Sequence, residues 1–225
     1  NKGKKYFIAV SNMATTMFGS VDNPDDYISI LEKHNVTYRL HIDGAYGGFV
    51  YPFSNQNSKI NFSNPKISSI TIDAHKMLQA PYGTGIFVCR KGLIENVLTK
   101  EAEYVEGMDL TLCGSRSGAN AVAVWMILFT YGAYGWFEKV SILQMRTQFL
   151  CNELDKLNIK YFREPFMNIV TIHSESIPEK IAEKYDLVPQ QHNEHNRWYK
   201  IVLMDHVEVE HLTKFIDELK ASLNG

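Results

Sequence analysis

The chain has 225 residues, of which 45% are hydrophobic, and a formal net charge of -2 with acidic and basic residues interspersed. This length and composition predict a globular protein that buries a core in one large domain or two smaller ones. The balanced charge gives no general attraction to nucleic acid or to an anionic membrane, so we expect neither as a partner. A partner must therefore be recognised by a particular site.

The three cysteines are widely spaced and form neither a CxxC pair nor a cluster at metal-ligand spacing. This predicts a reduced, cytoplasmic setting and no metal site. The longest apolar run, AVAVWMILF at 121–129, is too short to span a bilayer and predicts a buried core helix. The N-terminus runs directly into an apolar stretch of strand length without a signal pattern, so we expect the chain to be a piece of something longer.

The first part of the chain alternates short apolar segments with a helix or with polar loops. A helix is expected at 22–35, with Ile28, Leu31 and Ile30 turned inward. Strands are expected at 6–10, 38–43, 67–73 and 83–90. Strands separated in this way predict a mostly parallel sheet in an α/β domain.

From residue 115 onward the pattern changes. A helix at 115–134 should lie against the sheet, and a long amphipathic helix at 136–158 should bury a face that includes Phe137 and Val140. The remaining elements form an α+β pattern, with strands at 166–173 and 198–204 and helices at 178–185 and 207–223. We therefore predict a large domain at 1–135 and a smaller C-terminal domain at 136–225.

Three ionisable groups follow two of the predicted strands. Asp43 ends one strand, and His75 and Lys76 follow another. Ligands of open parallel sheets bind outside the carboxyl ends of the strands, so these groups could converge on one pocket. Taken singly, each residue is explained as well by a turn or by a polar strand end, since Asp-Gly is a frequent turn pair.

Taken together, the three groups suit one task. A lysine amine can form an imine with a carbonyl cofactor, and a buried aspartate can keep a pyridine nitrogen protonated. A histidine beside the lysine can contact the ring or the phosphate of such a cofactor. These are the roles that pyridoxal 5'-phosphate requires, and we predict it as the cofactor.

Four segments resemble motifs of the pyridoxal-phosphate-dependent amino-acid decarboxylases. HIDGAYGG (41–48) resembles H-[VA]-D-A-A-x-x-G, and SITIDAHKM (69–77) resembles S-x-x-x-[ND]-x-H-K-[MLW]. TLCGSRSG (111–118) is similar to T-[LI]-x-G-[ST]-R-x-G, and ATTMFGSVD (14–22) resembles G-T-T-x-x-G-x-x-D. Each pattern alone is weak, but the four occur in the family's order and at similar spacings between residues 6 and about 130.

The resemblance implies roles for the matching positions. Lys76 would carry the cofactor as an imine, and Asp43 would pair with the pyridine nitrogen. Ala45 would leave room for the ring, Thr16 would contact its edge, and His75 would reach the phosphate region. Asp73 stands where some relatives have asparagine, and a carboxylate there would have to turn away from a phosphate.

The same resemblance implies roles for further positions. Tyr104 would donate the proton that replaces the lost carboxylate, from a loop that reaches a neighbouring subunit, which implies a homodimer. Arg116, with Ser115, would bind the phosphate at a helix start. Lys200 would bind the substrate carboxylate, where some branches have arginine, and Arg197 is close by. A tyrosine packed on an ordinary loop and a helix-start ion pair remain alternatives for Tyr104 and Arg116.

The resemblance implies the pyridoxal-phosphate transferase-like fold and the conversion of an L-amino acid to an amine and carbon dioxide. Two alternatives stay open: a carbon–carbon lyase of the sphingosine phosphate lyase type, and a non-catalytic half-site that needs a partner chain. The family's large domain has a preceding half with a phosphate loop, and nothing before Tyr6 matches it. We therefore expect an upstream half-domain that is missing here or supplied by another chain. The pattern does not identify the amino acid.

Overall fold

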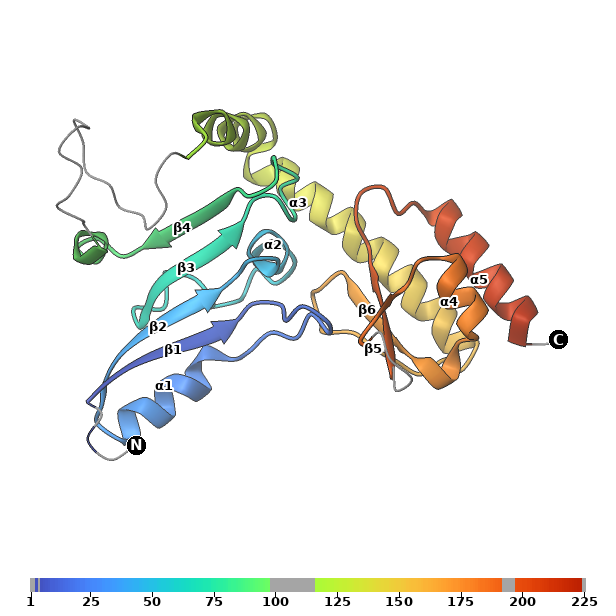
Figure 1. Cartoon of the computed structure of the whole chain (residues 1–225), viewed down its shortest axis with the longest axis horizontal. Helices are drawn as coiled ribbons and strands as arrows, with labels where there is room; N and C mark the ends of the chain where they lie inside the picture. Colours follow the sequence, from blue (N-terminus) through green and yellow to red (C-terminus); the bar gives the residue numbers. More distant parts are fainter. Residues whose placement is uncertain (1–2, 4, 98–115, 192–196, 224–225) are drawn as a thin grey trace.

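The computed structural model describes residues 3, 5–97, 116–191 and 197–223, which form two sheets joined by a long helix (Figure 1). The first sheet has the strand order β1 (Tyr6–Asn12), β2 (Thr37–Asp43), β3 (Ile67–Asp73) and β4 (Gly85–Cys89). The first three strands are parallel, and β4 runs antiparallel to β3. The predicted mostly parallel sheet is therefore confirmed, with one antiparallel edge strand.

One face of this sheet is covered by α1 (Pro24–Lys33). The helix begins where the side chain of Asn23 accepts a hydrogen bond from the Asp25 backbone N–H at 3.2 Å, with a proline in the first turn. Ile28 packs into the core, as predicted, whereas Ile30 is 60% exposed and its predicted inward position is wrong. The covered face also contains Leu40 and Ile42 of β2.

The two sheets are joined by α3 (Gly118–Lys156), where two separate helices were expected. Gly132 breaks it with a φ of 57° and a ψ of -170°, a conformation that glycine adopts without steric cost. The predicted domain boundary at residue 135 falls inside α3 just after this break, and it stays a prediction. Short elements lie between the larger ones: η1 (Gly47–Phe49), α2 (Tyr51–Ser54), η2 (Ile94–Val97) and η3 (Ser174–Ser176).

The second sheet is antiparallel and has the strand order β5 (Tyr161–Phe162), β6 (Ile169–His173), β8 (Trp198–Val202) and β7 (Val188–Pro189). Figure 1 shows α4 (Glu179–Lys184) and α5 (Val209–Leu223) beside this sheet and the C-terminal part of α3. The main core of this half is formed by buried side chains of these elements, among them Leu150, Leu154, Val170, Ile172, Leu203, Phe215 and Leu219. The predicted α+β pattern is present in this half.

The predicted burial of the run at 121–129 is wrong for the described part of the chain. Trp125 and Phe129 stack on each other at 5.2 Å between ring centroids, and they are 60% and 76% exposed. From this run, Val124 and Ile127 pack against a buried cluster that includes Trp136. Among the described residues, we find no helix long and apolar enough to cross a bilayer.

Candidate active site

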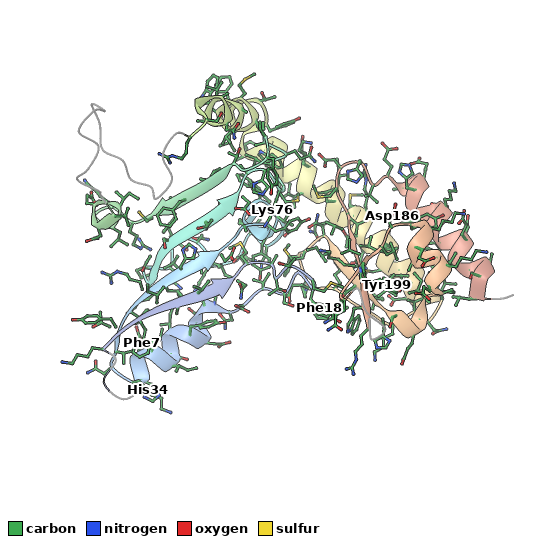
Figure 2. The ribbon with its side chains drawn as sticks, in the orientation of Figure 1. Phe7, Phe18, His34, Lys76, Asp186 and Tyr199 are labelled. Carbon is green, nitrogen blue, oxygen red and sulfur yellow. The ribbon has the colours of Figure 1, made fainter. Side chains whose placement is uncertain are left out.

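A cavity of about 510 Å³ lies between the carboxyl ends of β1 and β2 and the second sheet. Side chains from five segments of the chain line it: Asn12, Ala14, Thr15, Thr16, Asp43, Ala45, Tyr46, Lys76, Ile169, Lys200 and Val202. Figure 2 shows Lys76 at the end of the first sheet that faces this second half. The cavity therefore brings together the five predicted site residues Thr16, Asp43, Ala45, Lys76 and Lys200.

Asp43 reaches the cavity because it is the last residue of β2, opposite Asn12 of β1 and Thr71 of β3. Its backbone C=O accepts a hydrogen bond from the Met13 N–H at 2.7 Å, which fixes the strand end. Its carboxylate Oδ1 accepts a hydrogen bond from the Ala45 N–H at 3.1 Å. The turn-capping role considered as the alternative is therefore real, and the same half-buried carboxylate also lines the cavity.

Lys76 lies in the tight turn that follows β3, with its backbone N–H bonded to the Asp73 C=O at 3.0 Å. Its Nζ lies 2.9 Å from Asp73 Oδ2, and the lysine and aspartate side chains are 40% and 24% exposed. The Asp73 carboxylate is thus turned toward the cofactor-lysine candidate. Because the pair is only partly buried, we expect the ion pair to hold the amine in place more than to stabilise the fold.

The His75 side chain contacts Thr84 and not the cavity that Lys76 lines. Its Nδ1–H donates to the Thr84 C=O at 3.1 Å, since a carbonyl can only accept, and its Nε2 lies 4.0 Å from Asp73 Oδ2. Its ring meets that of Tyr82 edge-on at 5.2 Å. His75 is not among the residues that line the cavity of Lys76. Its predicted contact with a cofactor phosphate stays a prediction.

Lys200 enters the cavity from the second sheet. It lies on β8, and its Nζ donates a hydrogen bond to the Thr16 C=O at 3.0 Å. Partial burial lowers the pKa of Lys200, because a buried amine loses solvation of its charged form. The contact ties the segment after β1 to the second sheet and places a second amine in the cavity.

Two further cavity residues, Ala14 and Tyr46, have an unusual backbone conformation and a shifted pKa, respectively. Ala14 has a φ of 78°, in the left-handed region that favours glycine, and it stands where the family motif G-T-T has its glycine. Tyr46 is partly buried, and its loss of solvation raises the pKa of its phenol and keeps it neutral. Motif comparison could have drawn attention to Ala14. No role was predicted for Tyr46, and Asn12 was missed because the predicted strand ended at residue 10, two residues before the end of β1.

Of the remaining predicted residues, those that the structure describes do not line this cavity. Arg116 is exposed, just before the start of α3, and does not line it. Tyr104 and Ser115 lie outside the described residues, so their roles stay predictions. Within the described ranges, we find no group of three or more His, Cys, Asp or Glu side chains placed to hold a metal ion.

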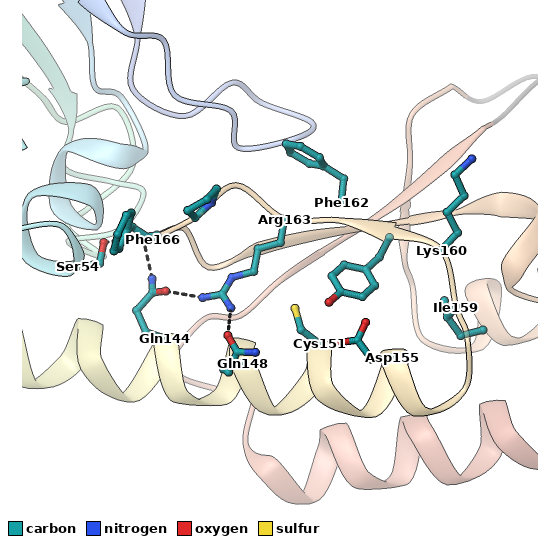
Figure 3. A pocket seen from close by; sticks show the side chains of 12 residues that line it. Ser54, Gln144, Gln148, Cys151, Asp155, Ile159, Lys160, Phe162, Arg163 and Phe166 are labelled. Atoms are coloured by element: carbon teal, nitrogen blue, oxygen red, sulfur yellow. Dashed lines mark hydrogen bonds between the residues drawn. The ribbon is translucent and has the colours of Figure 1, made fainter.

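Figure 3 shows a larger cavity, of about 860 Å³. It is lined by side chains of α2, α3, β5 and the segments on either side of β5, and contains none of the predicted site residues. Its polar side chains largely pair with each other: the Arg163 guanidinium donates to Gln144 Oε1 at 2.7 Å and to Gln148 Oε1 at 2.8 Å. Size alone therefore does not make it the better candidate.

Comparison with known proteins identifies the family of the chain. A model of the pyridoxal-dependent decarboxylase conserved domain matches residues 1–167. The chain is 59% identical over 218 residues to tryptophan decarboxylase from Clostridium sporogenes, covering 97% of this chain and 52% of that protein. It is 32% identical to a probable L-tyrosine/L-aspartate decarboxylase from Methanocella arvoryzae, covering 96% of this chain and 58% of that protein. The chain thus spans just over half the length of these curated relatives.

Solved structures show the same fold at low identity. The chain superposes on a sphingosine-1-phosphate lyase from Burkholderia pseudomallei with a TM-score of 0.80 at 18% identity, covering 97% of this chain and 52% of that one. It superposes on a Lactobacillus brevis glutamate decarboxylase with a TM-score of 0.77 at 20% identity, covering 96% and 54%. The predicted pyridoxal-phosphate transferase-like fold is therefore confirmed, and the chain covers about half of each of these structures. The chain belongs to the pyridoxal-dependent decarboxylase family, and the predicted family and cofactor are confirmed.

Proposed function

We propose that the complete protein converts an L-amino acid to an amine and carbon dioxide, with pyridoxal phosphate bound covalently to Lys76. The observation that carries this proposal is that Lys76, Asp43 and Lys200 line one cavity at the carboxyl ends of parallel strands. Family membership supports the reaction class. Ligand binding at this edge is also the general rule for open parallel sheets.

The groups in the cavity fit the cofactor. When bound, pyridoxal phosphate supplies a carbonyl that condenses with primary amines and a protonated ring that accepts electrons released at the substrate α-carbon. Lys76 would hold the cofactor through Nζ, and Asp43 would keep the proton on the ring nitrogen. The Ala45 N–H holds the Asp43 carboxylate in one orientation, and the small Ala45 side chain leaves room for a ring.

The ion pair of Lys76 with Asp73 is compatible with this role. The Asp73 carboxylate lies 2.9 Å from Nζ of Lys76 and would hold the lysine side chain in one position at the cavity. On this proposal Asp73 orients the lysine and need not face the phosphate.

The substrate we propose is an aromatic L-amino acid, with tryptophan as the first candidate. The support is the 59% identity to a protein described as tryptophan decarboxylase. In the cavity, Tyr46, Ile169 and Val202 offer apolar surface, and Lys200 offers a positive charge for the substrate carboxylate. The predicted homodimer, the cytoplasmic location and the proton-donor role of Tyr104 are carried into this proposal unchanged.

The test is carbon dioxide release by the complete protein supplied with pyridoxal phosphate and single amino acids: tryptophan, tyrosine, phenylalanine, aspartate, glutamate and serine. We expect tryptophan to react fastest and Lys76→Ala to lose activity and the visible absorbance of lysine-bound cofactor. Lys66→Ala is the matched control, because Lys66 is also a partly exposed lysine paired with a carboxylate, that of Glu32. Turnover that survives in Lys76→Ala would overturn the assignment of this lysine.

A further inference from the structure

A fully buried polar side chain near the candidate site is that of Asn168, which precedes β6 and is 0% exposed. Its Nδ2 donates a hydrogen bond to the Leu203 C=O at 2.9 Å, and its Oδ1 accepts one from the Tyr46 hydroxyl at 3.0 Å. A carbonyl can only accept, so the contact with Leu203 fixes which end of the amide is nitrogen. Both ends of the amide are therefore satisfied in one orientation.

Each contact of Asn168 lies beside a candidate site residue. Tyr46 follows Ala45 in the turn that begins at Asp43, and Met77, whose Sδ is 4.0 Å from Asn168 Nδ2, follows Lys76. Leu203 comes directly after β8, the strand that carries Lys200. The single carboxamide thus contacts three segments that reach the cavity from separate parts of the chain.

The turn that leads into Asn168 is braced by hydrogen bonds, and Figure 3 shows the one between Gln144 and the Phe166 C=O. Phe166 has a φ of 68°, which is unfavourable for a side chain of this size, and its C=O accepts hydrogen bonds from Ser54 Oγ and Gln144 Nε2. The Arg163 Nε donates to the Met167 C=O at 3.2 Å, and Met167 is fully buried. These contacts fix the backbone immediately before Asn168, so its amide has little freedom to move.

We infer that Asn168 is a positioning residue of the candidate active site, setting the segments of Lys76 and Tyr46 relative to the strand of Lys200. The inference rests on the proposed function and assigns a role just outside residues 1–167, which the family model matches. The physical reason is that the buried amide has two hydrogen-bond partners. If either partner shifts, a buried polar group loses its hydrogen bond. Catalytic groups displaced by about 1 Å can lose about a hundredfold in rate.

The test compares Asn168→Leu, which removes all the amide's hydrogen bonds at similar volume, with Tyr46→Phe, which removes one of them. Both are made in the complete protein. The measurements are kcat and KM for the best amino acid, and the rise in melting temperature on adding pyridoxal phosphate. The matched control is Thr147→Val, because Thr147 is also 0% exposed but its hydroxyl bonds only to the Leu143 C=O inside α3.

We expect Asn168→Leu to lower kcat/KM about 10- to 100-fold, mainly through kcat, and to reduce the cofactor-induced rise in melting temperature. Tyr46→Phe should lower kcat/KM about fivefold, which is the effect of one lost hydrogen bond. If Asn168→Leu does not fold, the kinetics of Tyr46→Phe alone test the inference. The double variant should be no worse than Asn168→Leu alone, because both changes remove the same bond. Thr147→Val should lower the melting temperature but leave kcat/KM and the cofactor-induced rise in melting temperature unchanged.

Wild-type kcat/KM and cofactor response in both Asn168→Leu and Tyr46→Phe would overturn the inference. So would equal losses in Thr147→Val, because they would show a general effect of destabilisation. In either case a working wild-type enzyme that is inactive as Lys76→Ala would leave the proposed function standing. A wild-type protein that binds no pyridoxal phosphate would overturn the proposed function and, with it, this inference.

Discussion

Lys200 is the residue through which the second sheet enters the cavity, and its charge is the feature that a substrate carboxylate would recognise. We predict that Lys200→Met raises KM for the amino acid about 30-fold, because one charge-assisted hydrogen bond contributes about 2 kcal/mol. The effect on kcat should be smaller. Steady-state kinetics measure both, and Lys200→Arg, which keeps the charge, should restore part of the affinity. An unchanged KM in Lys200→Met would remove this residue from the substrate site.

His41 lies on the same face of β2 as Asp43, two residues away. Its Nδ1 lies 2.8 Å from Ser69 Oγ and its Nε2 3.2 Å from Thr71 Oγ1, and its ring stacks on Phe87 at 6.2 Å. Burial lowers the pKa of His41, and the charge of Asp43 offsets part of the effect. The folded protein therefore favours the neutral imidazole.

This shift gives His41 a pH-dependent effect on stability. Between the lowered pKa of the folded state and about 6.5 in the unfolded chain, the unfolded state binds more protons. Stability must therefore fall as the pH falls through this window. We predict that His41→Gln loses less stability than the wild type between pH 7.5 and pH 5.5 in urea unfolding. His34→Gln, which removes an exposed imidazole, is the control, and an identical loss in wild type and His41→Gln would contradict the prediction.

Ala14 holds a conformation that costs an alanine about 1 kcal/mol and a glycine almost nothing. Ala14→Gly should therefore raise the free energy of unfolding, by up to about 1 kcal/mol, despite the greater entropy of glycine in the unfolded chain. Ala133→Gly, at an exposed position of α3, should instead lower it by about 1 kcal/mol. Denaturant unfolding of both variants measures the contrast. Equal destabilisation would show that Ala14 is not strained.

At the scale of elements, the turn after β2 packs directly on the end of β1. The Gly47 N–H donates to the Met13 C=O at 3.1 Å, and a Cβ on Gly47 would overlap that carbonyl oxygen. Gly47→Ala must therefore push apart the two segments that carry Ala14 and Asp43. We predict a loss of about 1 to 3 kcal/mol of stability together with weaker cofactor binding.

The control for this element is Gly118→Ala, because a Cβ on Gly118 meets nothing within 4 Å. This residue begins α3, and alanine there should be neutral or slightly stabilising. Thermal unfolding with and without pyridoxal phosphate compares the two variants. A Gly47→Ala protein with wild-type melting temperature and cofactor response would show that the turn has room to adjust.

Most strands and helices could be predicted because local patterns encode them, whereas the two-residue strands β5 and β7 were not predicted. Apolar segments marked β1, β2 and β3, and the proline and acids marked the start of α1. The burial of 121–129 could not be predicted, because an apolar run indicates preference for burial but not the surface that provides it. Phe129 is 76% exposed for this reason, although its hydrophobicity equals that of a core residue.

At the scale of the whole molecule, motifs predicted five residues that line the candidate cavity but not the contacts that join the two sheets around it. Asp43, Lys76 and Thr16 were predicted from short segments with recognisable spacing. Asn168 was not, because its partner Tyr46 is 122 residues away and a single polar residue before a strand carries no local signal. The hydrogen bonds that join the two sheets depend on tertiary packing, which no local pattern contains.

The most direct test of the account is to identify the lysine that binds the cofactor. The complete protein is mixed with pyridoxal phosphate, reduced with borohydride and digested, and the modified peptide is identified by mass spectrometry. We predict the pyridoxyl phosphate group on Lys76, with no modification of that peptide in Lys76→Ala. Stoichiometric modification of Lys200 or any other lysine in place of Lys76, or of none, would contradict the account.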